Sequence, residues 1–115
     1  MAWELKERRY FDRVAIPANA NMFVQDDQGN RLGRVTMLGR GGFLLDTERR
    51  FPAGEALTMF FVAETEGIRR AVNIVQRYTA PNGNVGFEFQ GLEPEVTIEI
   101  AVLIGKYFEA SNITQ

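Results

Sequence analysis

The chain has 115 residues, of which 45% are hydrophobic and 24% charged, a size and composition typical of one globular domain rather than of a disordered, collagenous or membrane protein. Its formal charge of −2 gives no overall attraction for DNA or RNA, so we expect no binding to a nucleic-acid polymer. Cysteine and histidine are both absent, which excludes disulfides, thiolate metal sites, cysteine nucleophiles and histidine general bases.

The N-terminal segment is rich in charged residues. It contains Arg8, Arg9 and Arg13 and precedes the first apolar alternation, so we expect an arm at 1–13 followed by one domain at 14–115. The opening residues are charged where a signal peptide needs an apolar core, and no apolar run approaches the length of a membrane span. We therefore expect a cytoplasmic protein without membrane insertion.

The domain begins with a pattern of strands. From Val14 to Val24 apolar residues alternate with other residues, a period of two that indicates one strand with a buried face. Pro17 places the start of this strand at a sheet edge. The sequence Asp-Asp-Gln-Gly-Asn at 26–30 predicts a turn, because these residues tolerate the backbone angles of a tight reversal. A second strand is expected at about 31–38.

A glycine-rich segment follows the second strand. The segment Gly39-Arg40-Gly41-Gly42 interrupts the strand, since glycine permits backbone angles that a side chain forbids, and residues 43–46 form a further strand. Further strands are expected at 57–62, 68–78 and 85–89, with a hairpin turn at 81–84. About six short strands at close spacing predict a closed or nearly closed antiparallel barrel.

The last segment has a helical period. Apolar residues at i, i+4, i+7, i+8, i+11 and i+12 share one helical stripe, and Pro94 suits a first helical turn. We expect a helix at about 94–110 that caps the barrel. The predicted fold class is therefore all-β with a C-terminal helix, a six-stranded antiparallel barrel. The β-branched residues of this helix would also suit the seam of a homodimer. The stripe consists of Val96, Ile100, Leu103, Ile104, Tyr107 and Phe108.

The arginine cluster before the first strand is the main candidate for binding. Arg9 and Arg13 are four residues apart, and on an extended arm their guanidinium groups can approach one anion from two directions. Each can hold phosphate oxygens or the acceptor edge of guanine, and each can stack on a base. The alternative is that these side chains are solvated or pair with Glu7 and Asp12.

The order of these features resembles that of the PilZ domain family over about residues 7–110. An arginine arm, a barrel, a glycine-rich turn and a closing Val-Gly-Phe-Glu-Phe strand follow one another. The first family signature, Arg-x-x-x-Arg, is matched by Arg9 and Arg13, with Arg8 as a further basic residue in front. The resemblance implies a PilZ-like barrel and a receptor for cyclic di-GMP, a bacterial second messenger with two guanines and two phosphates.

The second family signature is incomplete. In the pattern Asp or Asn, x, Ser, x, x, Gly, the acidic or amide position is Met37, the serine position is Gly39, and only Gly42 matches. In family members this signature binds polar groups of guanine, while the arginines hold phosphates and guanine edges. A hydrogen bond to a charged group is worth roughly 1.5–3 kcal/mol, so its loss would weaken binding by about one to two orders of magnitude.

The implied ligand site combines the arm with the glycine turn. Arg34 and Arg40 could supply positive charge near the phosphates and Met37 could pack flat on a base; alternatively both arginines face solvent. Arg77 and Tyr78 stand where contact from the barrel face is geometrically possible. The expected ligand-binding residues are Arg8, Arg9, Arg13, Met37, Gly39, Arg40 and Gly42.

Two functions are compatible with this sequence. One is a receptor and adaptor that binds cyclic di-GMP and relays its level to an unknown protein partner. The other is a PilZ-like protein-interaction adaptor of the kind used in pilus or motility machinery, without the nucleotide. The sequence contains no carboxylate pair, phosphate loop with lysine or metal-ligand cluster, so we expect no enzyme, metal site or cofactor.

Overall fold

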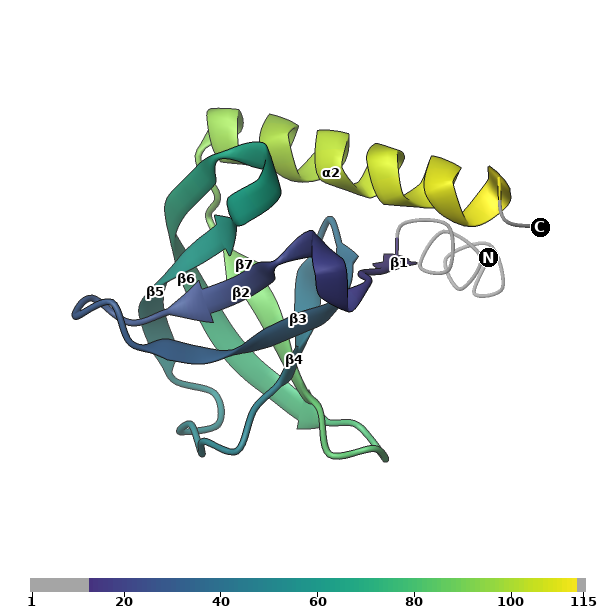
Figure 1. The fold of residues 1–115 in the computed structure, drawn as a ribbon. Helices are drawn as coiled ribbons and strands as arrows, with labels where there is room; N and C mark the ends of the chain where they lie inside the picture. The colour runs from purple at the N-terminus through teal and green to yellow at the C-terminus, as the bar shows by residue number, and fades with distance from the viewer. Residues whose placement is uncertain (1–12, 114–115) are drawn as a thin grey trace, which may run out of the picture.

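The computed structural model describes residues 13–113, with the side chains of residues 13–109. The expected arm therefore lies outside the described residues except for Arg13. The elements are β1 (Arg13–Ala15), η1 (Ala18–Ala20), β2 (Met22–Gln25), β3 (Arg31–Gly39), β4 (Gly42–Asp46), β5 (Ala56–Ala63), η2 (Glu64–Glu66), β6 (Ile68–Thr79), β7 (Val85–Gln90) and the helix α2 (Pro94–Ile113). Figure 1 labels the strands and the helix along the chain.

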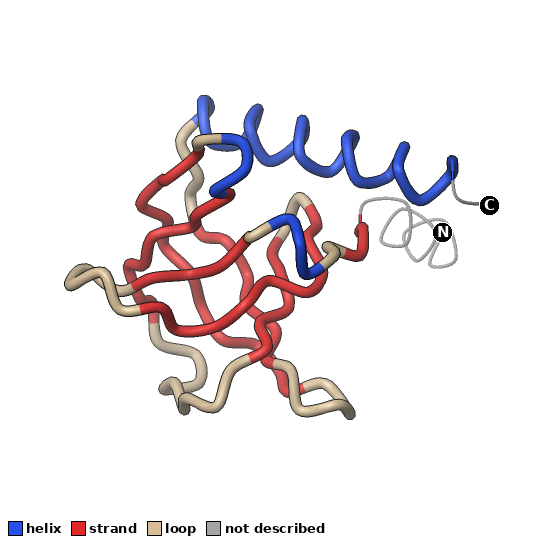
Figure 2. Tube along the Cα trace, viewed as in Figure 1, coloured by secondary structure: helices blue, strands red, loops and turns tan. Residues whose placement is uncertain are grey.

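Six strands close into an antiparallel barrel. The sheet runs β1-β3-β2-β5-β6-β7-β4, and β4 pairs back onto β3, so that β2 to β7 form a ring. Figure 2 shows this ring of strands with the helix lying across one end. The predicted six-stranded barrel with a C-terminal helix is thus confirmed, and β1 is an additional strand on β3. Within residues 13–113, no helix has the length and apolar character needed to cross a membrane.

The continuous strand expected from Val14 to Val24 is wrong. Pro17 has no N–H to donate to a ladder and ends β1, the next three residues form the 3-10 turn η1, and Asn21 adopts the left-handed conformation at φ 51°. The two pieces then pair with different partners, β1 with the end of β3 and β2 with its start and with β5. The alternation persists because both pieces turn their apolar residues into the same core.

The glycine segment forms a hairpin between β3 and β4. Leu38 pairs with Phe43, so the chain reverses at Arg40 and Gly41. The described glycines with positive φ are Gly29, Gly54, Gly67, Gly83 and Gly91, which excludes the special backbone angles expected in the glycine segment. Gly42 is required for another reason: a Cβ built there would stand 1.9 Å from the carbonyl oxygen of Phe87 on β7.

Aromatic side chains fill the centre of the barrel. The ring centroids of Phe43 and Phe87 are 5.4 Å apart and the rings are stacked, while Phe61 and Phe89 meet Phe43 at 5.9 and 5.4 Å. All four residues are buried. Offset and edge contacts of this kind add to the stabilisation from apolar burial.

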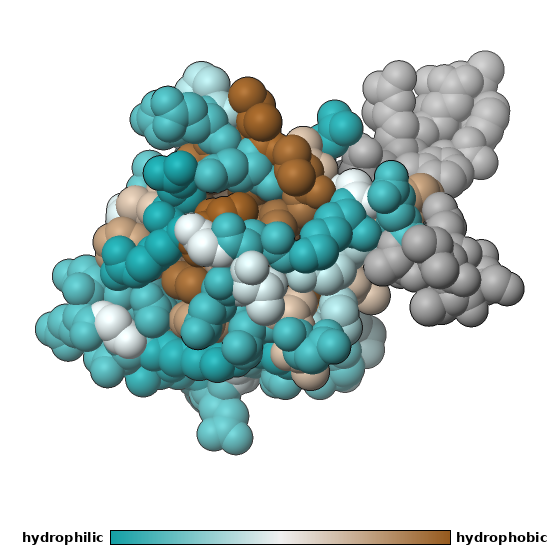
Figure 3. Space-filling view, turned by 45° about the horizontal axis from the view of Figure 1, so that its top comes forward, coloured by the Kyte–Doolittle hydropathy of each residue, from teal (hydrophilic) through white to brown (hydrophobic). Residues whose placement is uncertain are grey.

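The helix α2 covers the end of the barrel and contacts β1 and β3 (Figure 1). Five residues of the predicted stripe are buried, but Phe108, at its far end, is 38% exposed. Ile98 and Val102 are about two thirds exposed, at 64% and 65%. They contribute to the hydrophobic surface that Figure 3 shows along the helix.

Candidate functional site

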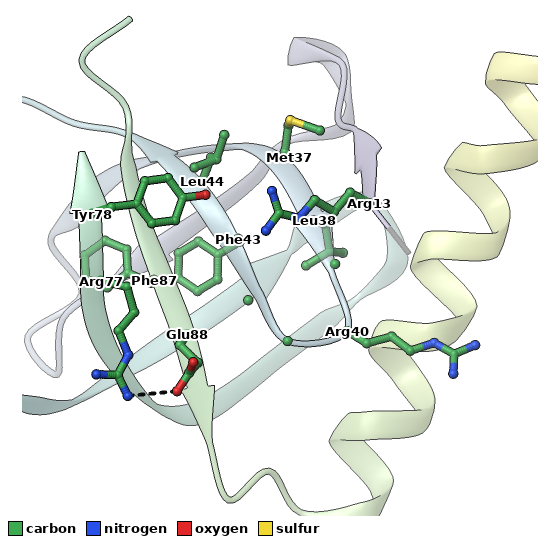
Figure 4. A pocket seen from close by; sticks show the side chains of 13 residues that line it. Arg13, Met37, Leu38, Arg40, Phe43, Leu44, Arg77, Tyr78, Phe87 and Glu88 are labelled. Carbon is green, nitrogen blue, oxygen red and sulfur yellow. Dashed lines mark hydrogen bonds and ion pairs between the residues drawn. The ribbon is translucent and has the colours of Figure 1, made fainter. Parts of the chain in front are cut away.

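A pocket of about 440 Å³ opens on the barrel wall beside the β3–β4 hairpin (Figure 4). It contains five of the seven residues expected to bind ligand, and the other two, Arg8 and Arg9, lie outside the described residues. These five residues come from two separate segments of the chain and lie together in one pocket. The lining consists of Arg13, Met37, Leu38, Gly39, Arg40, Gly41, Gly42, Phe43, Leu44, Arg77, Tyr78, Phe87 and Glu88.

Strand register brings the two signatures together. β1 pairs with the end of β3 so that Arg13 stands directly opposite Gly39, the serine position of the second signature. On the other side of the hairpin Gly42 stands opposite Glu88 of β7. Gly39 and Gly42, which we call the glycine floor, both line the pocket; Gly39 is buried and Gly42 is half-buried.

Arg13 is positioned to bind an anion. Its side chain is exposed, and the guanidinium makes no hydrogen bond or ion pair with the residues that the structure describes. Figure 4 shows it beside Leu38 at the edge of the pocket. A guanidinium with its donors unoccupied can bind phosphate oxygens without first breaking an internal ion pair.

The two arginines considered as additional charges lie in different places. Arg40 lines the pocket at the tip of the hairpin, although its side chain extends away from Met37 and Tyr78 in Figure 4. Arg34 donates from Nη1 to the carbonyl oxygen of Ile16 at 3.4 Å and does not line the pocket. Of this pair, Arg40 alone contributes charge to the pocket.

β6 and β7 form the opposite wall. The register between them shifts, with Gln76 opposite Phe87 but Tyr78 opposite Gly86, so Arg77 is the extra residue of a bulge. The ring of Tyr78 covers Gly86, where a Cβ would come within 2.5 Å of the ring. Glycine at position 86 leaves room for this contact, and 45% of the tyrosine stays exposed.

An ion pair lies on the same wall. Arg77 Nη2 donates to Glu88 Oε1 at 2.9 Å, and Gln90 Nε2 donates to the same oxygen at 2.7 Å. The hydrogen bond from Arg77, and then its charge, lower the pKa of Glu88 from its ordinary value. From the sequence, contact by Arg77 and Tyr78 was geometrically possible, whereas Glu88 was not among the expected site residues. The alternation of Val85, Phe87 and Phe89 already placed Glu88 on the outer face.

The pocket combines positive charge with apolar surface. Three arginines and one glutamate line it, a formal charge of +2. Met37, Leu44 and Tyr78 form a single row across the strands, because Met37 pairs with Leu44, Leu44 with Gly86, and Gly86 with Tyr78. Such a surface suits a planar ring that carries phosphate groups. No group of three acidic side chains that could hold a metal ion occurs within the described residues.

Comparison with known proteins agrees with this geometry. The family model described as PilZ domain matches residues 7–105. No curated protein matches the chain. PilZ domains are binding and adaptor domains, generally non-enzymatic, and cyclic di-GMP is their general ligand. With most of its length matched and its barrel closed as expected, this chain belongs to the PilZ domain family.

Proposed function

We propose that this chain is a cytoplasmic receptor and adaptor that binds cyclic di-GMP and relays its level to a protein partner. One observation carries the proposal: Arg13 of the first signature stands opposite Gly39 of the second and shares a pocket with the hairpin glycines. The meeting of the two signatures in a pocket of positive charge supports retention of the site.

In the proposed complex the arginines hold the phosphates and the barrel wall receives a base. Arg13 is available at the pocket, and Arg8 and Arg9 would approach from the N-terminal segment. A base would lie on the glycine floor beside the thioether of Met37, a polarisable group that packs well on aromatic rings. Without an acidic side chain at 37 and a hydroxyl at 39, we expect affinity about one to two orders of magnitude below that of a complete site.

Calorimetric titration of the full chain with cyclic di-GMP tests the proposal. Arg9→Ala and Arg13→Ala should each weaken binding about tenfold to a hundredfold, the value of one charge-assisted hydrogen bond. Arg50→Ala is the matched control, since Arg50 is exposed and lies outside the pocket. Wild-type protein that gives neither heat nor a rise in melting temperature at millimolar nucleotide would refute the receptor function.

A ligand-free adaptor is the second candidate. The observations that favour it are the replaced polar positions, Met37 and Gly39, together with the exposed Ile98 and Val102 on α2. Exposed apolar residues on one helix face are a frequent feature of protein interfaces. The same titration separates the candidates, because this adaptor would give no nucleotide signal in the wild type and no difference between Arg13→Ala and Arg50→Ala.

A further inference from the structure

The proposed site lacks the usual acceptor for guanine. The Watson–Crick edge of guanine carries two hydrogen-bond donors, N1–H and the N2 amino group, and a base held out of a stack is read through this edge. Position 37 holds methionine, whose sulfur is only a weak acceptor. Among the described residues that line the pocket, Glu88 is the one carboxylate. The strongest acceptor of this pocket therefore lies on β7 instead of β3.

Glu88 faces the glycine floor from the end opposite to Arg13. Arg13 pairs with Gly39 and Glu88 pairs with Gly42, while Gly39 and Gly42 flank the two-residue turn of the hairpin. These four residues form a row across β1, β3, β4 and β7. At roughly 4.8 Å between neighbouring strands, the Cα atoms of Arg13 and Glu88 are about 14 Å apart. Figure 4 shows Arg13 and Glu88 at opposite ends of the pocket.

The carboxylate of Glu88 is oriented but not saturated. Arg77 and Gln90 both donate to Oε1, and Oε2 accepts no hydrogen bond from the residues that the structure describes. A carboxylate offers about four acceptor positions, so at least half of them face other groups or water. The hydrogen bond from Arg77 lowers the pKa of Glu88 from its ordinary 4.5, which favours the ionised form of the carboxylate further.

We infer that Glu88 selects guanine in this pocket, by accepting hydrogen bonds from N1–H and the N2 amino group of one base in place of the missing acidic side chain at position 37. The inference rests on the proposed function and adds the residue that reads the base. Adenine has an unprotonated N1 at the same position, whose lone pair faces the carboxylate unfavourably. In this arrangement Arg13 contacts phosphate. Cyclic di-GMP and cyclic di-AMP both carry phosphates, so Arg13 does not discriminate between them.

The test compares affinities of the full chain for cyclic di-GMP, cyclic di-AMP and cyclic di-IMP, whose bases lack the N2 amino group. Wild type should prefer cyclic di-GMP over cyclic di-AMP by at least about tenfold, with cyclic di-IMP between them. Glu88→Gln should weaken cyclic di-GMP binding about tenfold to a hundredfold and leave cyclic di-AMP within about threefold of wild type. Arg13→Ala should weaken all three nucleotides by the same factor.

Two controls separate base reading from a structural effect. Glu48→Gln changes an exposed carboxylate outside this pocket and should leave all affinities unchanged. Arg77→Ala removes the hydrogen bond from Arg77 to Glu88 but keeps the Glu88 carboxylate, so the preference for guanine should remain. The inference is overturned if Glu88→Gln retains the wild-type preference, or if Arg77→Ala alone abolishes it. If wild type binds none of the nucleotides, the proposed function itself fails.

Discussion

Gly42→Ala should destabilise the barrel much more than the same change at the neighbouring Gly41. A Cβ at 42 would stand 1.9 Å from the oxygen of Phe87, whereas real Cβ atoms essentially never come within 3.0 Å of a non-bonded atom. The strands β4 and β7 must therefore part by about 1.1 Å. The hydrogen bond from Phe89 N to Gly41 O, 2.9 Å long, would then approach 4 Å and be lost. With the strain of overpacking, the free energy of unfolding should fall by about 2 to 4 kcal/mol.

Gly41→Ala is the matched control, because no atom lies within 4 Å of a Cβ built there and the backbone is not left-handed. Urea unfolding followed by circular dichroism gives both free energies, and the Gly42→Ala melting temperature should be lower by roughly 10 °C or more. Gly41→Ala should remain within about 0.5 kcal/mol of wild type. Equal stability of the two variants would show that the close approach of β4 to β7 is not the reason for glycine at 42.

Two other predictions concern the pocket and the helix. The double change Met37→Asp with Gly39→Ser restores the missing acceptors and should tighten cyclic di-GMP binding about tenfold to a hundredfold by calorimetry; a folded variant without any gain would contradict the motif alignment. Arg70 donates a hydrogen bond to Glu99 on α2, and this bond lowers the pKa of Glu99 below its ordinary 4.5. The ion pair therefore stabilises the fold fully above pH 4.5, and the stabilisation is lost as the pH falls through the pKa of Glu99 in the folded protein. The free energy of unfolding should therefore decrease between about pH 6 and about pH 3, and less steeply in Glu99→Gln; parallel slopes for the two proteins would exclude a contribution from this pair.

Periodicity predicted the elements well where a single residue pattern determines the structure. The helix follows from apolar spacing, since Val96, Ile100 and Leu103 are buried against the barrel as that spacing requires. The prediction of one strand from Val14 to Val24 was wrong for the converse reason. Alternation indicates which residues enter the core. It does not indicate that the strand is interrupted between Pro17 and Asn21.

The site was predicted in part because its two signatures are local in sequence. Arg13 and the glycine segment carry recognisable patterns, and barrel topology brings them into register. The opposite wall has no such pattern. Arg77 owes its orientation to a bulge in β6, where Ile74 and Val75 are both buried and the period of two is lost. Glu88 is recognisable as a residue of the pocket only when β7 is known to pair with β4 of the hairpin.

Among the described residues β1 spans Arg13–Ala15, and it belongs to two parts of the molecule at once. Its first residue, Arg13, borders the pocket, and the next, Val14, is buried in the core that β1 shares with α2. A molecule that displaces the backbone at Arg13 must also displace Val14, one peptide unit away, and thereby disturb the seating of a helix twenty residues long. β1 thus joins the wall of the pocket to the core beneath α2 through two successive residues.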